Sequence, residues 1–167
     1  VMPLPEDEAA WAALNVMFAT AKGSVRRNSL SDFTQINQSG KIAMKFEDED
    51  ADDRLIAVLP CSDADDVLLA TREGKCVRFP VADVRVFQSR SSTGVRGMKL
   101  GDGDEVISMS MLAHSDAETE ERDAYLRYTA AQRRIRAGET GVQLPSEMSQ
   151  ERAAELGGKE QFVLTVT

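Results

Sequence analysis

Short apolar runs separated by turn residues dominate the first two thirds of the chain. Residues 16–21 form an apolar run of β-prone residues, and Lys22-Gly23 offers a tight turn. Residues 24–28 then return as a second strand. Two β-prone runs joined by a short glycine turn are typical of a β-hairpin, so the pattern predicts a hairpin over 16–28.

The segment after this hairpin alternates between apolar and polar positions. In residues 41–46, one face carries Ile42, Met44 and Phe46, and the intervening residues face the other way. A period of two residues predicts a third β-strand. An acidic loop then leads to a fourth predicted strand at 54–59.

The same order of segments occurs a second time. FATAKGSVRR at 18–27 returns as LATREGKCVR at 69–78, and GKIAMKF at 40–46 returns as GVRGMKL at 94–100. The spacing from Gly23 to Gly74 is 51 residues. An internal period of this size indicates an array of one supersecondary unit. The second unit has predicted strands at 67–72, 75–79, 95–100 and 105–111.

The segment after the second unit has a helical pattern. Ser115 with Glu118 forms a capping box, and Gly138 provides a stop for a helix that reaches about Ala137. Ser149 caps a second short predicted helix. FVLTVT at 162–167 restarts the strand pattern, and we expect it to pair with the second unit, because its apolar side chains would otherwise be exposed.

Four short antiparallel strands per unit is the arrangement of a propeller blade. We therefore expect an all-β fold with a helical insertion, built from propeller-like repeats of four-stranded antiparallel blades. The opening and closing residues indicate a piece of a longer polypeptide. The predicted boundaries are a lead-in segment 1–15, a first blade 16–66, a second blade 67–112, a helical insertion 113–161 and the first strand of a further blade, 162–167.

Charge modifies this picture, because the net charge of −8 argues against a nucleic-acid partner. Residues 16–112, however, contain 13 basic and 15 acidic residues. Most of those acids lie in the loops 47–53 and 63–66 and in the turn 102–105. The predicted strands are mostly basic, so an acidic protein can still carry a cationic stripe.

Few sequence features indicate chemistry in this chain. Cys61 and Cys76 lack the spacing of metal ligands, and we expect neither a metal nor a cofactor. No apolar run approaches the roughly 18 residues of a membrane span, so we expect a cytoplasmic protein without a membrane partner. No nucleophile–base pair or P-loop occurs, so we expect this chain to perform no catalysis by itself.

Four segments resemble the C-terminal domain of the bacterial DNA gyrase A subunit. They are ATAKGSVRR at 19–27, GKIAMKF at 40–46, VRF at 77–79 and STGVRGMKLGDGDEVISM at 92–109. The resemblance implies a β-pinwheel, a propeller-like disc of four-stranded blades, with duplex DNA wrapped around a basic rim. It also implies a parent enzyme that is an ATP-hydrolysing DNA topoisomerase introducing negative supercoils. The implied protein partners are the rest of the gyrase A subunit, together with the gyrase B subunit.

The matched basic positions are the candidate DNA contacts. Lys45 and Lys99 match between the units, as do Arg27 and Arg78, while Arg96 lies next to the STG turn. Lysine and arginine contact phosphates without reading the base sequence, so we expect binding to the DNA backbone. The predicted DNA-binding residues are Arg26, Arg27, Lys41, Lys45, Arg78, Arg90, Arg96 and Lys99.

Two alternatives remain open at this stage. The Gln-Arg-Arg-Gly-Gly-Lys-Gly type of box that marks gyrase does not occur, so the related C-terminal domain of topoisomerase IV is one alternative. The other is a propeller-like protein-interaction scaffold whose basic residues only protect sheet edges. DNA wrapping would weaken steeply with salt, whereas a scaffold would hardly bind DNA.

Overall fold

The computed structural model describes residues 4–34, 38–40, 42–46, 51–88 and 92–164 of the 167-residue chain. The chain divides into two compact units, Val1–His114 and Ser115–Thr167. We call the first the β unit and the second the helical unit. Strands β1–β7 of the structure lie in the β unit, and both α-helices lie in the helical unit.

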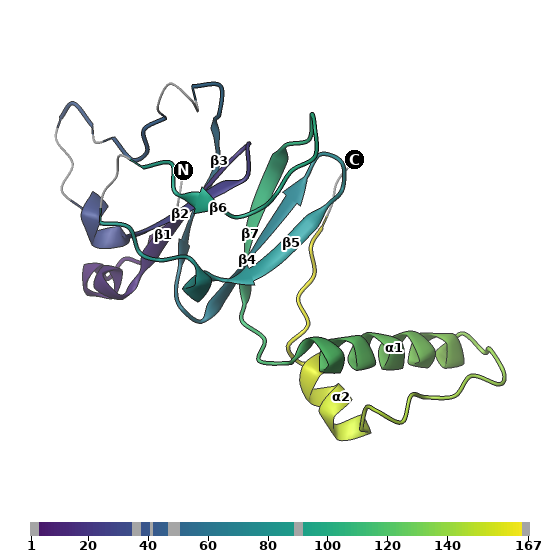
Figure 1. Ribbon diagram of the computed structural model, residues 1–167. Helices are drawn as coiled ribbons and strands as arrows, with labels where there is room; N and C mark the ends of the chain where they lie inside the picture. The colour runs from purple at the N-terminus through teal and green to yellow at the C-terminus, as the bar shows by residue number, and fades with distance from the viewer. Residues whose placement is uncertain (1–3, 35–37, 41, 47–50, 89–91, 165–167) are drawn as a thin grey trace. The chain divides into compact units, whose positions relative to one another are not determined.

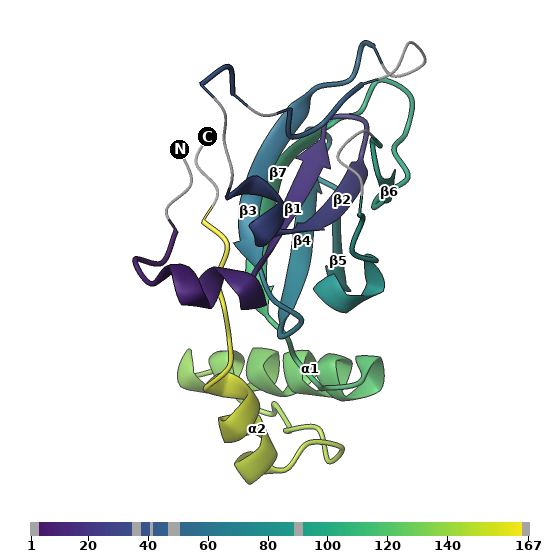
Figure 2. The ribbon, with the colours of Figure 1, turned by 90° about the vertical axis from the view of Figure 1, so that its left-hand side faces the viewer.

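Two antiparallel sheets make up the described part of the β unit (Figures 1 and 2). The strand order is β3-β1-β2-β6 in the first sheet and β5-β4-β7 in the second. The first sheet contains β1 (Asn15–Thr20), β2 (Ser24–Ser29), β3 (Leu55–Cys61) and β6 (Val95–Arg96). The second contains β4 (Asp65–Thr71), β5 (Cys76–Pro80) and β7 (Val106–Ala113). Short 3-10 helices occupy Glu8–Ala13, Leu30–Phe33 and Val81–Asp83.

The β1–β2 hairpin turns at the predicted glycine. Gly23 has φ +85°, a conformation that glycine adopts without steric cost. The Thr20 hydroxyl accepts a hydrogen bond from the Ser24 N–H at 3.1 Å. The buried Asp53 carboxylate accepts one from the Lys22 N–H at 2.9 Å. These side chains satisfy backbone donors that the tight turn leaves without backbone partners.

The β4–β5 hairpin repeats this turn contact by contact. Gly74 has φ +83°, and the Thr71 hydroxyl accepts from the Lys75 N–H at 3.1 Å. The buried Asp104 carboxylate accepts from the Glu73 N–H at 3.1 Å. Each residue lies 51 positions after its counterpart, so the repeat seen in the sequence is a repeat of hydrogen bonds.

The third strand of each unit departs from the predicted pairing. We expected 95–100 to complete the second sheet, but β6 pairs with β2 of the first sheet, with Val95 opposite Val25. The Gly23 carbonyl then accepts from the N–H groups of Gly97 and Met98, at 2.9 and 3.1 Å. Residues 42–46 lie outside the strands, and residue 41 lies outside the described residues.

Close packing against β2 explains two glycines of the TGVRG sequence. A Cβ atom at Gly94 would lie 2.1 Å from the Val25 carbonyl oxygen, and φ there is +104°. A Cβ atom at Gly97 would lie 2.8 Å from Val25 Cγ1. Any other residue at these positions would have to push the segment away from the first sheet.

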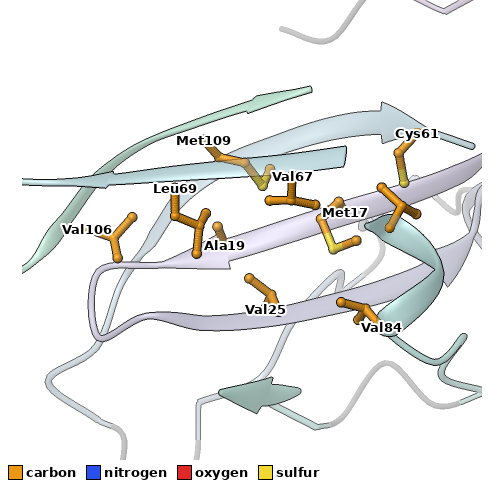
Figure 3. Packing of buried hydrophobic residues seen from close by; sticks show 10 residues of the cluster. Met17, Ala19, Val25, Cys61, Val67, Leu69, Val84, Val106 and Met109 are labelled. Carbon is orange, nitrogen blue, oxygen red and sulfur yellow. The ribbon is translucent and has the colours of Figure 1, made fainter. Parts of the chain in front are cut away.

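The main hydrophobic core lies between the two sheets (Figure 3). Alternate residues of one face of β1 and β2, including Met17, Ala19 and Val25, are fully buried there. Val67 and Leu69 of β4 meet them from the second sheet. This burial follows the period of two expected for strands that pack on one face.

A second cluster covers the opposite face of the first sheet. Val16, Phe18 and Leu30 form its buried centre, and Trp11 and Met44 pack against it. Since both faces of β1 are covered, residues 16–19 are buried without alternation. This double coverage explains why the β1 sequence is a continuous apolar run.

The helical unit contains α1 (Thr119–Arg136) and α2 (Gln150–Gly157). The Ser149 hydroxyl caps α2 as predicted, accepting from the Arg152 N–H at 3.1 Å. The predicted capping box at Ser115 is wrong. Helix α1 begins four residues later, with Glu118 as its N-cap and no side-chain capping bond.

Two tyrosines join the helices into one small core. Tyr125 and Tyr128 of α1 are buried with Leu156 of α2 and with Met148 from the preceding loop. The Arg152 guanidinium on α2 bridges to the Glu121 carboxylate on α1 through bonds of 2.6 and 2.9 Å. The unit therefore has its own apolar core and its own helix–helix ion pair.

The end of the described chain departs from its predicted strand. Residues 161–164 lie outside the strands, and the side chains of Phe162 and Leu164 are 85% and 87% exposed. Residues 165–167 of the predicted strand lie outside the described residues.

Candidate nucleic-acid interface

The structure places the eight predicted DNA contacts in three different settings. Arg26 and Arg27 are buried, Arg78 is partly covered by ion-pair partners, and Lys45, Arg96 and Lys99 are exposed. Lys41 and Arg90 lie outside the described residues.

Arg26 holds two neighbouring segments against the first sheet. Its exposed fraction is 0%, and its guanidinium lies 4.9 Å from the centre of the Phe18 ring. The guanidinium donates to the Ser92 carbonyl at 2.5 Å and also to the Ala43 carbonyl. An arginine used in this way satisfies carbonyls of neighbouring segments and presents little charge to an approaching phosphate.

Arg27 is likewise part of the protein interior. Its Nη1 atom donates to the carbonyls of Val81 and Val84 at 3.2 and 3.4 Å. Its Nη2 atom pairs with the Asp63 carboxylate at 2.5 Å. Arg27 became a candidate because it matches Arg78 between the units, and Arg26 because it lies next to Arg27; neither signal reports burial.

Arg78 belongs to a cluster at the end of the second sheet. Its Nε atom donates to the buried Asp66 carboxylate at 2.7 Å, and His114 Nδ1 lies 2.7 Å from the other carboxylate oxygen. Burial opposes ionisation of Asp66, but the hydrogen bonds from His114 and Arg78 outweigh it and lower the pKa of Asp66. Arg78 therefore already has an anionic partner, although 31% of its side chain is exposed.

Lys45 and Lys99 are exposed in segments that otherwise pack against protein. Lys45 follows Met44, which packs on the Phe18 cluster, and Lys99 follows Met98, which packs on the core between the sheets. Neighbouring residues of an extended chain point to opposite sides, so each packed methionine directs the next lysine outward. Lys45 and Lys99, which match in the sequence, therefore also have matching exposed positions in the tertiary structure.

Arg96 completes a set of cations that we call the open cations: Lys45, Arg96 and Lys99. Arg96 lies on β6 and is exposed. Within the described ranges, none of the three forms an ion pair. A cation without an acidic neighbour is available to a phosphate, whereas a paired one must first lose its partner.

One further exposed cation was not predicted from the sequence. Arg85 is exposed, and its guanidinium lies 4.2 Å from the centre of the Phe87 ring. Its counterpart 51 residues earlier is Thr34, so a comparison of the two units offers no signal for it.

Several other cations of the β unit are neutralised by acids. Arg54 and Arg72 both pair with Glu105, and Lys22 pairs with Asp52. Lys75 pairs with Glu73 at 3.2 Å. Acidic side chains thus neutralise the cations of the turns. The open cations, in contrast, lie on segments whose described residues include no acid.

Two other kinds of site do not occur among the described residues. They contain no group of three His, Cys, Asp or Glu side chains placed to hold a metal ion. None of the described helices is both long enough and apolar enough to cross a bilayer.

Burial raises the pKa of the Cys61 thiol to about 12, so this thiol stays protonated at neutral pH.

Comparison of the chain with known proteins finds a matching family model. The model of the DNA gyrase C-terminal domain, described as a β-propeller, matches residues 14–62 and 65–112. Residues 113–167, which include the whole helical unit, lie outside that match.

Some curated relatives match the chain over its full length, and others match part of it. The DNA gyrase A subunit of Granulibacter bethesdensis is 50% identical and that of Rickettsia bellii is 48% identical, each over 100% of this chain. The DNA gyrase A subunit of Staphylococcus aureus is 41% identical over 63% of this chain. The chain spans about a fifth of the length of the first two proteins, 19% and 18%.

Solved structures share the fold. The structure of a DNA gyrase A C-terminal domain aligns with a TM-score of 0.52 at 26% identity, covering 60% of this chain and 32% of that one. The C-terminal domain of DNA topoisomerase IV aligns with a TM-score of 0.57 at 20% identity, covering 70% and 38%. The predicted propeller-like class of repeats is confirmed by these matches.

Proposed function

The chain belongs to the DNA gyrase C-terminal domain family, and we propose that its β unit binds duplex DNA as part of a surface around which DNA wraps. The observation that carries this proposal is the set of open cations, Lys45, Arg96 and Lys99. All three are exposed and free of ion pairs with described residues.

The backbone that carries these cations is held in place. Gly97 and Met98 bond to the Gly23 carbonyl, and Gly94 packs directly on Val25. A cation on a fixed backbone loses less conformational freedom when it meets a phosphate, so its contact contributes more to affinity. This argument favours Arg96 and Lys99 as backbone contacts.

The proposed binding is directed at the DNA backbone and not at base sequence. The open cations lie on a strand and on extended segments, and none lies on a helix that would enter the major groove. Lysine and arginine contacts to phosphate position the duplex without reading bases. Buried Arg26 and Arg27 have a structural role in this proposal, and Arg78 is a secondary contact because Asp66 already pairs with it.

We further propose that the parent protein is a gyrase A subunit, which acts with the gyrase B subunit in ATP-dependent negative supercoiling. The relatives at 50% and 48% identity carry the name of the gyrase A subunit. The topoisomerase IV structure, at 20% identity, supports the fold and not the activity. In this proposal the chain supplies DNA binding, while the chemistry resides elsewhere in the parent.

The test is the salt dependence of DNA binding by the full-length protein that contains this chain. Each phosphate contact contributes about 0.9 to the slope of log K against log salt on B-form DNA. Lys45→Ala with Lys99→Ala should lower that slope by roughly 1–2 and leave the thermal melt nearly unchanged, because exposed lysines add little to stability.

The matched control removes two lysines that acids already neutralise. Lys22→Ala with Lys75→Ala gives the same change in net charge, but these lysines pair with Asp52 and Glu73. The control should change the slope far less. An equal loss in both double variants would indicate a general charge effect, and an unchanged Lys45/Lys99 variant would favour the protein-interaction scaffold or a DNA path over Arg96.

A further inference from the structure

The helical unit contains a charged groove that the DNA-binding proposal for the β unit leaves unexplained. Charge is unevenly distributed along α1, whose first turn carries two glutamates and whose last turn carries three arginines. Glu120, Glu121 and Asp123 belong to the acidic end. Arg133, Arg134 and Arg136 belong to the basic end.

Ion pairing divides the basic residues of this unit into two groups. Arg134 pairs with Glu139, and Arg152 pairs with Glu121 and Glu155. Lys159 pairs with Asp116 and Glu155 at 3.6 and 3.3 Å. Arg122, Arg127, Arg133 and Arg136 are exposed, and none of the four forms an ion pair with another described residue. Of these unpaired arginines, Arg133 and Arg136 line the same groove.

Arg133 and Arg136 lie at one groove between the two helices. The groove has a volume of about 360 Å³ and is lined from α1 by Thr129 and Gln132 as well as by the two arginines. Gln150 lines it from α2. Residues three positions apart on a helix share a face, so both guanidinium groups can reach the same ligand.

The single acid of this groove already has a partner. The Tyr125 hydroxyl donates to the Glu160 carboxylate at 2.6 Å. Burial of the Tyr125 hydroxyl and its bond to Glu160 raise the pKa of Tyr125 to about 12, so the phenol stays protonated and the bond persists at neutral pH. Two free guanidinium groups therefore face one carboxylate that is hydrogen-bonded within the unit.

The lining of the groove favours a phosphate over a protein surface. Apart from Tyr125, its apolar contribution comes from the small residues Ala153 and Ala154. A stable protein interface is centred on large apolar or aromatic anchors, which this groove does not offer to a partner. Guanidinium groups, amides and a hydroxyl are donors that suit phosphate oxygens.

We propose that the groove lined by Arg133 and Arg136 is a second DNA-backbone contact, separate from the open cations of the β unit. This inference rests on the proposed function, because it takes the phosphates to be those of the DNA that the β unit binds. The family match ends at residue 112, so the groove lies outside the matched blades.

The test is a salt titration of duplex DNA binding by the full-length protein that contains this chain. Arg133→Gln with Arg136→Gln should lower the slope of log K against log salt by roughly 1–2, at about 0.9 per lost phosphate contact. Arg133→Lys with Arg136→Lys should keep most of the slope, since lysine retains both the charge and the favourable position at the helix C-terminus.

The matched control is Arg134→Gln with Lys159→Gln, which makes the same change in net charge. Both of these cations have acidic partners within the unit, so the slope should change far less. A thermal melt checks folding, and a lysine variant that folds but loses the slope as fully as the glutamine variant would overturn the proposal.

The outcomes separate this inference from the function on which it rests. If Lys45/Lys99 variants lose slope and the Arg133/Arg136 variants do not, the groove is not a DNA contact and the function of the β unit stands. If the glutamine variant instead weakens the association of the parent protein with its partners while DNA binding is unchanged, the groove binds protein and the proposal is wrong. If only the Arg133/Arg136 variant loses slope, the groove holds DNA, and Lys45 and Lys99 are not DNA contacts.

Discussion

The two halves of the β unit share a sequence pattern and a set of turn contacts, but they place their matched arginines in different surroundings. The Arg27 side chain on β2 is 6% exposed, whereas that of Arg78 on β5 is 31% exposed. Both arginines pair with an aspartate, Asp63 in one case and Asp66 in the other. The difference therefore lies in what covers each strand, and not in the strand itself.

The cover over β2 comes from the second half of the unit. The Phe87 N–H donates to the Arg27 carbonyl at 2.8 Å, and the Asn28 side chain donates to the Phe87 carbonyl at 2.8 Å. Strand β6 then pairs with the same edge. In the described part of the chain, β5 pairs with β4 alone. The matched arginine is thus buried in the first repeat, as Arg27, and half-exposed in the second, as Arg78, because its burial depends on the neighbouring repeat.

The largest expected contrast is between Arg27→Met and Arg78→Met. Methionine keeps much of the packing volume, but Arg27→Met leaves the Val84 carbonyl without its Arg27 donor, while the Val81 carbonyl keeps only the bond from the Val84 N–H. A buried acceptor without a partner costs roughly 1–3 kcal/mol, so we expect the free energy of unfolding to fall by about 3 kcal/mol. For Arg78→Met we expect a smaller loss of about 1 kcal/mol, because the Arg78 side chain is 31% exposed and the buried Asp66 carboxylate keeps its His114 partner.

Urea denaturation of this chain measures both values. Equal losses in the two variants would show that coverage by the second half does not distinguish β2 from β5. Arg27→Lys serves as a control, because it restores a charge for Asp63 but offers no planar fork for the two carbonyls.

A smaller contrast is expected between the matched turn glycines. Alanine at either position must adopt a positive φ, at a cost of roughly 1–2 kcal/mol. At Gly23 the new Cβ would also lie 2.8 Å from the Met98 carbonyl oxygen, whereas at Gly74 nothing lies within 4 Å. We expect Gly23→Ala to cost about 1–2 kcal/mol more than Gly74→Ala, since the crowded backbone must shift.

Thermal unfolding of the two alanine variants gives this difference. Similar melting temperatures would mean that the segment after β6 moves away from the turn without loss, which would contradict the tight packing of β6 on the first sheet.

The smallest expected effect is the pH dependence that Asp66 contributes in the second half. The pKa of Asp66 is lowered from its ordinary 3.8, since the bonds from His114 and Arg78 outweigh the effect of burial. A carboxyl whose pKa is lower in the folded state stabilises fully above the unfolded value, and that stabilisation is lost as the pH falls through the folded value. The counterpart of Asp66 in the first half is Asn15, which does not titrate.

We therefore expect Asp66→Asn to lower the free energy of unfolding at neutral pH and to flatten its decline below pH 3.8. Denaturation curves at a series of pH values compare the variant with the parent chain. Parallel pH profiles in the two proteins would assign the acid sensitivity to other carboxyls.

The sequence was sufficient for the hairpins but not for the complete sheets. Strands β1 and β2 lie within a residue of the predicted 16–28 hairpin, because an apolar run and a turn glycine specify a hairpin locally. The third strand was assigned to the wrong sheet. Alternation in 95–100 identifies an extended segment, but its partner is chosen by the packing of Gly94 and Gly97 on Val25.

The same limit applies to the candidate interface. Matching Lys45 with Lys99 found two exposed cations, because each follows a methionine that packs inward. Matching Arg27 with Arg78 did not distinguish a buried arginine from a half-exposed one. The groove at Arg133 was missed, since it depends on which arginines find acids on the neighbouring helix and loop.

What the sequence determined by itself is the repeat and its turns. Thr20 and Asp53 recur 51 residues later as Thr71 and Asp104, and their side chains make the same turn bonds, because these partners lie within the same repeat. Only the tertiary structure decided which edge β6 joins and which arginines are buried. The Arg26 guanidinium reaches the Ser92 carbonyl 66 residues away, and a contact over that separation depends on how one repeat packs on the next.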